Sequence, residues 1–320
     1  MGKKILVIYG PTGVGKSDFA LKLARLMNGE IINADVGQFY TPLSIGTAKP
    51  AWQSSDVPHY LFDIIDKPRN ITVTEYRSLV HGLILKIWDR NALPIIVGGS
   101  TFYINSLFFP PQSEALENKN MSSFDQYSDK QLWEMLKKID PQRASEIHPH
   151  DTYRIKRALT IWEQTNIKPS EYKPQYEPLA PYFLLFLNRE RFELYNRINE
   201  RVKQMIQVGW IEEVAALEGT EWESFLQHKK IIGYDDILYY LAQKNNHASI
   251  NTLIATIAQK TRNYAKRQIT FWQMLKRKLT PLAKQEYNVK IKSLCLTNNE
   301  QEEKYILMMQ EIKQWFFKDA

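Results

Sequence analysis

The chain has 320 residues, 44% of them hydrophobic, which excludes an intrinsically disordered protein and favours one large domain with a smaller one. A single cysteine, Cys295, excludes an internal disulfide framework and a cysteine-rich zinc site, and it fits a reducing cytoplasm. The formal net charge is +7, and the apolar runs are too short for a secretory signal or a membrane span, so we expect a cytoplasmic protein, taken as a monomer, with no membrane segment.

A glycine-rich loop lies near the N-terminus, between two predicted elements. The apolar run Ile5–Tyr9 predicts a buried strand, and the apolar spacing from Asp18 to Met27 predicts a helix. Between them the chain matches GxxxxGK[ST], which in this strand–loop–helix context indicates a phosphate cradle. Loop N–H groups, the helix N-terminus and Lys16 would bind a diphosphate, and Ser17 would offer its hydroxyl to Mg²⁺. The predicted diphosphate-binding residues are Gly10, Pro11, Thr12, Gly13, Val14, Gly15, Lys16 and Ser17.

Strands and helices then alternate along the first third of the chain. This order predicts an α/β fold, namely a P-loop core with a doubly wound parallel sheet. In such sheets ligands bind beyond the carboxyl ends of the strands, so Lys16, Asp35 and Ser100 should converge on one site. The predicted strands are Glu30–Ala34, Tyr60–Asp66, Pro94–Val97 and Tyr182–Asn188, and the predicted helices are Thr74–Asp89 and Phe102–Phe109.

A small helical insertion interrupts this core. Pro110 and Pro111 end the alternating pattern, the polar stretch Gln112–Asp129 reads as a boundary loop, and two helical segments follow before the prolines return. We expect a P-loop core at 1–110 and 180–320, with an all-helical insertion domain at 111–179. The helices expected in the insertion are Asp129–Ile139 and Asp151–Thr165, joined by a connector. After it we expect a long helix at Arg189–Leu217, a turn at Ile231–Tyr234, two helices, a strand at Lys290–Leu296 and a terminal helix.

The basic excess is concentrated near the C-terminus. From Ile237 to Gln285 there is no acidic residue, and nine lysines and arginines lie there, which is typical of a surface for a polyanion. A solvated helix face is the alternative interpretation, and the aromatic residues in this segment are more typical of a core. A second basic cluster lies in the insertion, at Arg154, Lys156 and Arg157. A polar stripe at helical spacing is formed by Arg262, Lys266, Thr270, Gln273 and Arg277.

The catalytic acid of a typical P-loop ATPase is absent from its usual place. The strand at Ile95–Val97 is followed by glycines and Ser100, whereas Asp35 directly follows the second strand. Beside a phosphate cradle, Asp35 could hold a metal ion or act as a general base.

Several motifs together carry a resemblance to a known family. The chain resembles the tRNA dimethylallyltransferases over almost its whole length, in the bacterial form, because it lacks the cysteines of the zinc finger found in many eukaryotic relatives. The matching residues are Gly10–Ser17; Asp35 with Gln38 and Tyr40; Ile45-Gly46-Thr47-Ala48-Lys49-Pro50; Pro58-His59 with Asp63-Ile64; Gly98-Gly99 with Tyr103; Asp140-Pro141, Ile147-His148-Pro149 and Asp151; Arg154 with Arg157-Ala158-Leu159; Arg197-Ile198, Arg201 and Met205; Gly233-Tyr234; and Thr261-Arg262 with Ala265-Lys266-Arg267-Gln268.

The resemblance implies prenyl transfer from dimethylallyl diphosphate to the N6 amine of an adenosine beside the anticodon of tRNA. The P-loop would hold the diphosphate with Mg²⁺ on Ser17, and Asp35 would take the proton from N6. The implied catalytic residues are Asp35, Ser100, Thr101 and Arg201. The implied tRNA-binding residues are Asp35, Val36, Gly37, Gln38, Tyr153, Arg154, Ile155, Lys156, Arg157, Lys230, Gly233, Tyr234, Lys266, Arg267, Gln268, Thr270 and Gln273.

Two positions depart from the family pattern. Gly99-Ser100-Thr101 stands where Gly-Gly-Thr is common, and Val36-Gly37 stands where serine and a larger residue are common. Three alternatives also stay open from the residues: an adenylate isopentenyltransferase acting on free AMP, ADP or ATP, a P-loop nucleotide kinase, and an RNA-binding protein without enzymatic activity.

Overall fold

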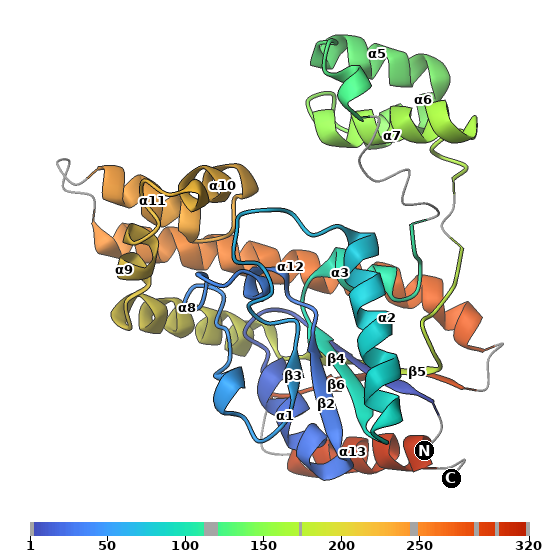
Figure 1. The fold of residues 1–320 in the computed structure, drawn as a ribbon, viewed down its shortest axis with the longest axis vertical. Coiled ribbons are helices and arrows are strands. Elements are labelled where there is room, and N and C mark those ends of the chain that lie inside the picture. Colours follow the sequence, from blue (N-terminus) through green and yellow to red (C-terminus); the bar gives the residue numbers. More distant parts are fainter. Residues whose placement is uncertain are drawn as a thin grey trace. The chain divides into compact units, whose positions relative to one another are not determined.

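A computed structural model describes residues 3–111, 121–172, 175–243, 249–284, 288–297 and 301–317 of the chain (Figure 1). The chain forms two compact units. The first, the core unit, comprises Met1–Ile71, Ser78–Asn105 and Leu179–Ala320, and the second, the helical unit, comprises Thr72–Arg77 and Ser106–Pro178. In the part of the chain that the structure describes, no helix is both long enough and apolar enough to cross a membrane.

The core unit is built on a parallel sheet, as the alternation of strands and helices predicted. Its strand order is β3-β2-β4-β1-β5-β6, and every neighbouring pair is parallel. The central strand pairs on both sides, with Val7 opposite Ile96 and Leu184. Within the described residues the strands are β1 (Ile5–Tyr9), β2 (Gly29–Asn33), β3 (His59–Tyr60), β4 (Leu93–Gly98), β5 (Tyr182–Asn188) and β6 (Val289–Cys295).

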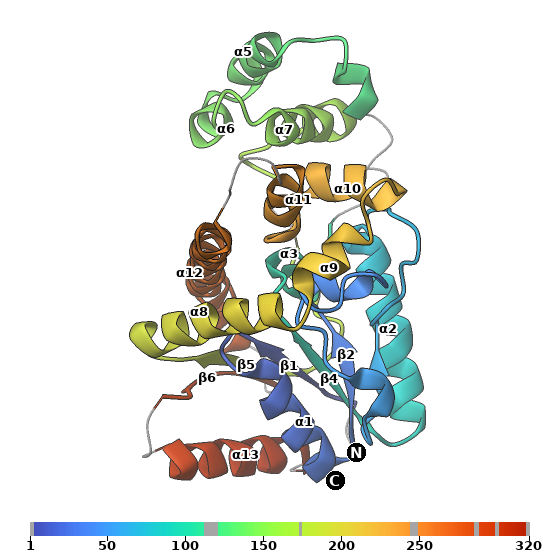
Figure 2. The ribbon, with the colours of Figure 1, turned by 90° about the vertical axis from the view of Figure 1, so that its left-hand side faces the viewer.

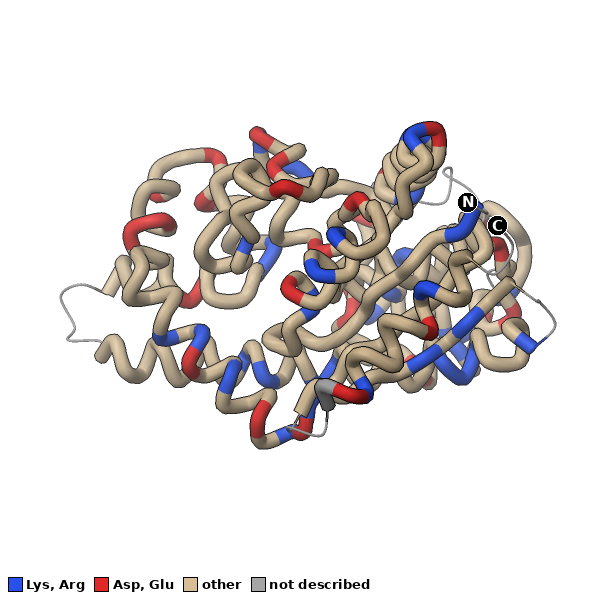
Figure 3. The backbone as a smooth tube through the Cα atoms, turned by 90° about the horizontal axis from the view of Figure 1, so that it is seen from below, with Lys and Arg blue, Asp and Glu red and all other residues tan. Residues whose placement is uncertain are grey.

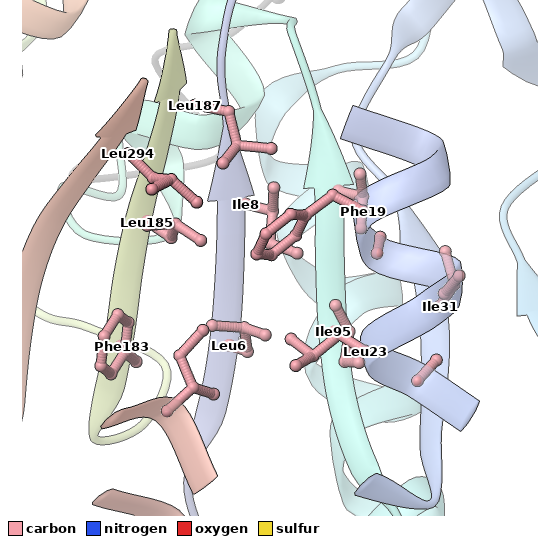
Figure 4. Packing of buried hydrophobic residues seen from close by; sticks show 14 of the residues in the cluster. Leu6, Ile8, Phe19, Leu23, Ile31, Ile95, Phe183, Leu185, Leu187 and Leu294 are labelled. Atoms are coloured by element: carbon pink, nitrogen blue, oxygen red, sulfur yellow. The ribbon is translucent and has the colours of Figure 1, made fainter. Parts of the chain in front are cut away.

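Helices cover both faces of this sheet, because its central strands are apolar on both sides. Helices α1 (Lys16–Met27) and α13 (Gln301–Phe317) lie together on one face (Figure 2). There Leu6 and Ile8 of β1 meet Phe19 of α1 in one apolar cluster (Figure 4). The long helix α12 (Ile250–Ala283) packs on the opposite face, where Trp272 stacks on Phe186 with ring centroids 4.6 Å apart.

Two predicted elements differ from the structure. The strand expected at Tyr60–Asp66 ends after Tyr60, because Leu61 and Asp63 adopt left-handed backbone angles with φ of 62° and 52°. The helix expected at Arg189–Leu217 is broken by Gly209, whose φ is 104°, a conformation that suits glycine. The result is two helices, α8 (Arg191–Gln207) and α9 (Trp210–Ala215).

The remaining helices of the core unit include two with predicted ranges and one that was not predicted. Helices α2 (Val73–Asp89) and α3 (Thr101–Ser106) appear close to their predicted ranges, α2 beginning in the helical unit. Helix α11 (Tyr234–Ala242) follows the predicted turn, whereas α10 (Glu221–Lys229) was not predicted. Residues 112–120, most of the first half of the predicted boundary loop, lie outside the described residues.

The helical unit has a small core of its own. Helices α5 (Asp129–Ile139) and α7 (Thr152–Thr165) bury Leu132 and Leu159 in one apolar cluster. A short helix, α6 (Pro141–Glu146), lies in the stretch expected to be only a connector. Asp140 caps its first turn by accepting the N–H of Arg143, and its second oxygen accepts the N–H of Ser170 at 2.7 Å.

Candidate active site

The glycine-rich loop joins β1 to α1, and three cations hold its carbonyl oxygens. Arg197 Nε donates to the carbonyl of Gly13, and Arg189 Nε donates to that of Val14, each at 2.9 Å. Lys16 Nζ donates to the carbonyls of Gly10 and Pro11, at 2.9 and 3.0 Å. The first N–H groups of α1 have no partner within the helix and carry its positive end, so they can bind a phosphate group.

This loop forms one wall of a cavity of about 510 Å³ beyond the carboxyl ends of β1, β2 and β4. Lys16 and Asp35, which the strand order predicted to converge, both line it, together with Arg201. A further wall comes from Gln38 and the loop that follows it. The other side chains and glycines around the cavity are Thr12, Gly13, Gly15, Ser17, Asp18, Thr47, Ala48, Pro50, Val97, Gly98, Arg197, Glu200 and Gln204.

The charges in this cavity perturb one another. Burial lowers the pKa of Lys16 to about 8, with Asp35 opposing the shift and Arg201 adding to it. Burial likewise lowers the pKa of the Arg201 guanidinium and raises the pKa of Asp35, whose carboxylate Lys16 partly stabilises. Three cations (Lys16, Arg197 and Arg201) and three acids (Asp18, Asp35 and Glu200) line the cavity, and the cations lie beside a loop whose N–H groups can bind a phosphate. Such a site is suited to an anionic ligand with a titratable group beside it.

Asp35 is held by the backbone around it. Its N–H donates to Asn33 Oδ1 at 2.9 Å, and the next N–H, that of Val36, donates to Ser100 Oγ at 2.9 Å. Ser100 therefore anchors the 3₁₀ turn Val36–Phe39. It is buried and, unlike Lys16 and Asp35, does not line the cavity on which we expected all three to converge. Tyr264 lies close enough to Asp35 for the carboxylate to raise its pKa, after the larger effect of burial. Thr101 begins α3 and is half-buried, and it does not line the cavity.

The residues present fit a magnesium ion that is shared with a phosphate ligand. Among the described residues, no group of three histidine, cysteine or acidic side chains could hold a metal ion by itself. The Ser17 hydroxyl and the carboxyl groups of Asp18, Asp35 and Glu200 nevertheless line the cavity. Mg²⁺ is usually bound by one or two carboxylates and substrate phosphates, and it keeps several waters. This donor set therefore fits Mg²⁺ only when a diphosphate is bound.

The loop after the 3₁₀ turn carries the Ile45–Pro50 motif, and its lysine has a structural role. Lys49 forms an ion pair with Asp63 and donates to the carbonyl of Tyr40 at 2.9 Å. Trp52 Nε1 donates to the other oxygen of Asp63 at 2.9 Å. Ala48 sits on the cavity wall with φ of 51°, a strained conformation for a residue with a side chain.

The residues predicted to bind tRNA fall into two groups. The members of the first group are exposed or half-buried, so they are accessible. The half-buried members are Asp35, Val36, Gln38, Lys156 and Arg157. Lys156 forms an ion pair with Asp125. Lysine and arginine are interspersed with acidic residues along much of the chain (Figure 3), whereas α12 contains no acid. The exposed members are Tyr153, Arg154, Lys230, Lys266, Arg267, Thr270 and Gln273.

The residues of the second group are buried. We expected them to contact tRNA directly, and their burial is incompatible with that contact. Gln268 is fully buried: its Nε2 donates to the carbonyl of Gly99, and its Oε1 accepts the N–H of Thr12, both at 2.8 Å. This amide ties α12 to the phosphate loop. Ile155 belongs to the core of the helical unit. The remaining buried members are Gly37, Gly233 and Tyr234.

Sequence reasoning assigned no role to several residues that shape the site. Arg189 directly follows β5 at the same edge of the sheet as Asp35, so its place at a strand end could have identified it. Arg197 precedes Arg201 by one helical turn on α8, a spacing that also points to the loop. Glu213 and Trp210, which hold the Ile45–Pro50 loop, lie about 165 residues from it, and no local pattern connects them.

Comparisons with known proteins agree with this geometry. A sequence profile of the IPP transferase family matches residues 38–275. A tRNA dimethylallyltransferase of Alkaliphilus metalliredigens is 38% identical over 281 residues, which cover 85% of this chain and 89% of that protein. The enzyme of the same name from Latilactobacillus sakei is also 38% identical, with the same coverage of both chains.

Solved structures agree as well. The structure of a tRNA isopentenylpyrophosphate transferase from Bacillus halodurans matches with a TM-score of 0.65 and 30% identity, over 98% of this chain and 96% of that one. A eukaryotic dimethylallyltransferase described as acting on tRNA matches with a TM-score of 0.80 and 27% identity, over 100% of this chain and 80% of that one. The profile match and the identity to full-length relatives lead to one conclusion: the chain belongs to the IPP transferase family.

Proposed function

We propose that this protein transfers the dimethylallyl group of dimethylallyl diphosphate to the N6 amine of an adenosine beside the anticodon of tRNA, and releases diphosphate. The observation that carries the proposal is the cavity in which a phosphate loop, three cations and a single strand-end carboxylate meet. Family membership supplies the reaction class, since the relatives matched above are named tRNA dimethylallyltransferases.

The cationic side of the cavity would bind the leaving group. When the allylic C–O bond breaks, negative charge builds on the diphosphate oxygens, and the loop N–H groups, Lys16 and Arg201 can stabilise it. Ser17 and a neighbouring carboxylate would hold Mg²⁺ against the same phosphates, which supplies further positive charge when it is bound. Arg189 and Arg197 would act through the loop backbone, because they hold its carbonyl groups away from the ligand.

Asp35 would act on the acceptor. As the N6 nitrogen forms its bond to the allylic carbon, one N–H proton must leave, and the Asp35 carboxylate is the acid–base group at the cavity end of β2. Burial raises its pKa, which makes the carboxylate a better proton acceptor than an exposed aspartate. Ser100 would contribute by fixing the backbone that follows Asp35, through its bond to the Val36 N–H.

Two exposed basic surfaces would bind the tRNA. On α12 the side chains of Lys266, Thr270, Gln273 and Arg277 are exposed along one helix, and on α7 Arg154 is exposed. Phosphate contacts of this kind position a nucleic acid without reading its sequence. The target adenine would have to leave its stack to reach the cavity. A monomer in the cytoplasm, where tRNA is found, is part of the same proposal.

A matrix of donors and acceptors tests the proposal. The purified protein is incubated with labelled dimethylallyl diphosphate or labelled ATP, each with tRNA, with AMP or with no acceptor. We expect label only in tRNA, and only from dimethylallyl diphosphate. Label in AMP would instead indicate an adenylate isopentenyltransferase, and transfer of phosphate from ATP would indicate a kinase. No observation described above favours either of these, and label in none of the arms would contradict the proposal.

A further inference from the structure

One carboxylate outside the cavity collects four hydrogen bonds. Glu213, on α9, accepts the N–H groups of Ser44 and Ile45 at Oε2, at 2.9 and 2.7 Å. Its Oε1 accepts the N–H of Gly46 at 3.3 Å and the hydroxyl of Tyr234 at 2.7 Å. Three of these donors are consecutive backbone N–H groups, that of Ser44 and the first two of the Ile45–Pro50 loop. The loop is therefore fastened to α9 by a single side chain.

Tyr234 is suited to remain a donor in this arrangement. Burial, followed by the Glu213 carboxylate, holds the pKa of its phenol well above the ordinary value. Its ring is fully buried and packs edge-on against Trp210, with centroids 5.6 Å apart. The tyrosine that sequence reasoning assigned to tRNA thus belongs to the support of this loop.

Trp210 reinforces the same attachment through packing. Its indole lies directly against the backbone of two glycines: a Cβ atom on Gly46 or on Gly233 would lie only 2.1 Å from a ring atom. No real side chain tolerates such a separation, so only glycine fits at either position. The glycine of the Ile45–Pro50 motif and that of the Gly233–Tyr234 motif therefore contact one buried ring.

The loop in turn contacts the segment that carries Asp35. A Cβ on Gly37 would lie 2.9 Å from the Thr47 methyl and 3.9 Å from Asp35 Oδ1, so Gly37 fills the narrow space between them. Gln38 Nε2 donates to the carbonyls of Thr47 and Ala48, at 3.1 and 3.3 Å. A displacement of the loop would therefore displace the 3₁₀ turn beside the carboxylate.

We propose that Glu213 is a positioning residue for the acceptor side of the reaction. By fixing the Ile45–Pro50 loop, it sets the wall of the cavity beside Asp35 and thereby the approach of the adenine amine to the carboxylate. This inference rests on the proposed function. Glu213 does not line the cavity itself, so its effect passes through the loop.

The donor side of the cavity has separate supports. The phosphate loop is held by Arg189, Arg197 and Gln268, and none of these residues touches Glu213 in the hydrogen bonds described above. Loss of the Glu213 carboxylate should therefore leave the binding of dimethylallyl diphosphate intact. A residue with only a general structural role would not separate the two substrates in this way.

The test uses three full-length variants, and Glu213→Gln is the main one. It preserves the shape of the side chain but replaces an acceptor oxygen with an NH₂ donor that faces two donors. Glu213→Asp restores the carboxylate on a shorter stem. Glu212→Gln is the matched control, because Glu212 is an exposed neighbour on the same helix and its substitution removes the same charge. Thermal unfolding is measured for each, so that kinetics are compared only at temperatures where the variant is folded.

For Glu213→Gln we expect kcat with saturating tRNA and donor to fall by about 10- to 100-fold, the usual effect of a misplacement of about 1 Å at a reacting centre. The KM for dimethylallyl diphosphate should stay within about twofold of wild type, since uniform donor binding is unchanged. Hydrogen exchange at the amides of Ser44, Ile45 and Gly46 should accelerate. Glu213→Asp should recover part of kcat, and Glu212→Gln should match wild type in every measurement.

Wild-type kinetics in Glu213→Gln would overturn the inference, as would a loss of donor affinity as large as the loss of kcat. Unchanged amide exchange at Ser44–Gly46 would also contradict it, because the carboxylate would then not hold the loop. A wild-type protein that fails to prenylate tRNA would instead refute the proposed function, and the exchange experiment would still report whether Glu213 fastens the loop.

Discussion

Asp35 is a carboxyl group in a site built mainly for an anion. Burial raises its pKa, while Lys16, the backbone N–H of Gly37 and Arg201 act in the opposite direction, so its ionised form depends on those two cations and that N–H group. Binding of a diphosphate would draw the same cations to the ligand, which would leave the carboxylate less stabilised and a stronger proton acceptor. Binding of the diphosphate donor would thus raise the basicity of Asp35, the group that we propose takes the proton from N6.

The change Asp35→Asn tests the role of this carboxyl group. The amide keeps the size of the side chain but cannot take a proton, so turnover should fall by about 10²-fold or more, the usual contribution of a general base. The affinity for tRNA should stay close to wild type, because the phosphate contacts lie elsewhere. Turnover is measured under single-turnover conditions and affinity by a filter-binding titration. Equal single-turnover rates in the two proteins would remove Asp35 from this role.

Lys16 gives the reaction a dependence on pH. Its pKa is lowered to about 8, so the ammonium of the free enzyme is lost as the pH rises through that value, and donor capture should weaken above it. Asp35 must be ionised, so activity should also fall as the pH drops through a pKa raised above that of an ordinary aspartate. We expect a bell-shaped profile of kcat/KM for dimethylallyl diphosphate. In Lys16→Arg the limb near pH 8 should disappear, and its persistence there would assign that limb to another group.

Helix α12 links the phosphate loop to an exposed basic surface that we propose binds tRNA. Its buried side carries Gln268, which bonds to the phosphate loop, and Trp272, which stacks on β5. Its exposed side carries Lys266 and Arg277. Arg262, the first residue of the predicted stripe, is engaged within the protein, since its guanidinium donates to Asn199 and Gln259. The exposed stripe is therefore shorter than the sequence pattern suggested.

The double change Lys266→Ala with Arg277→Ala tests the exposed side of α12. Each phosphate contact releases condensed counterions, so the slope of log K against log salt should shrink by about 0.7 to 0.9 for each charge removed. Binding should weaken alike for all tRNAs, and turnover at saturating tRNA should persist. The measurement is a series of tRNA titrations at increasing salt. An unchanged slope would mean that the stripe is a solvated surface, and the phosphate contacts would then have to be sought around Arg154.

The start of α11 shows how tightly this region is packed. Gly233 combines φ of 90° with the contact to Trp210, so a side chain there meets both backbone strain and overlap with a buried ring. Gly233→Ala should lower the free energy of unfolding by about 2 kcal/mol or more. Denaturant titration checks this value. As a control, Gly219→Ala has a comparable left-handed φ of 72° but open space around it, and it should cost less.

Across the whole molecule, sequence patterns predicted the features that depend on residues close together in the chain. The buried strand Ile5–Tyr9, the glycine loop and the carboxyl group just after β2 each have a signal within a few residues. The roles of Gln268 and Tyr234 could not be predicted in this way. Only tertiary packing determines that their polar groups point inward, Gln268 to Thr12 and Tyr234 to Glu213.

We propose above that the cavity brings a prenyl diphosphate and the N6 amine of a tRNA adenosine together, so that the prenyl group passes to N6 and diphosphate leaves. The most direct measurement is mass spectrometry of nucleosides from tRNA that has been incubated with the protein, Mg²⁺ and dimethylallyl diphosphate. We expect one adenosine beside the anticodon to gain a dimethylallyl group on N6 in place of a hydrogen, with one diphosphate released for each adenosine modified and with Asp35→Asn nearly inactive. Unmodified adenosine after incubation with folded wild-type protein, or a prenyl group on another atom, would contradict the claim.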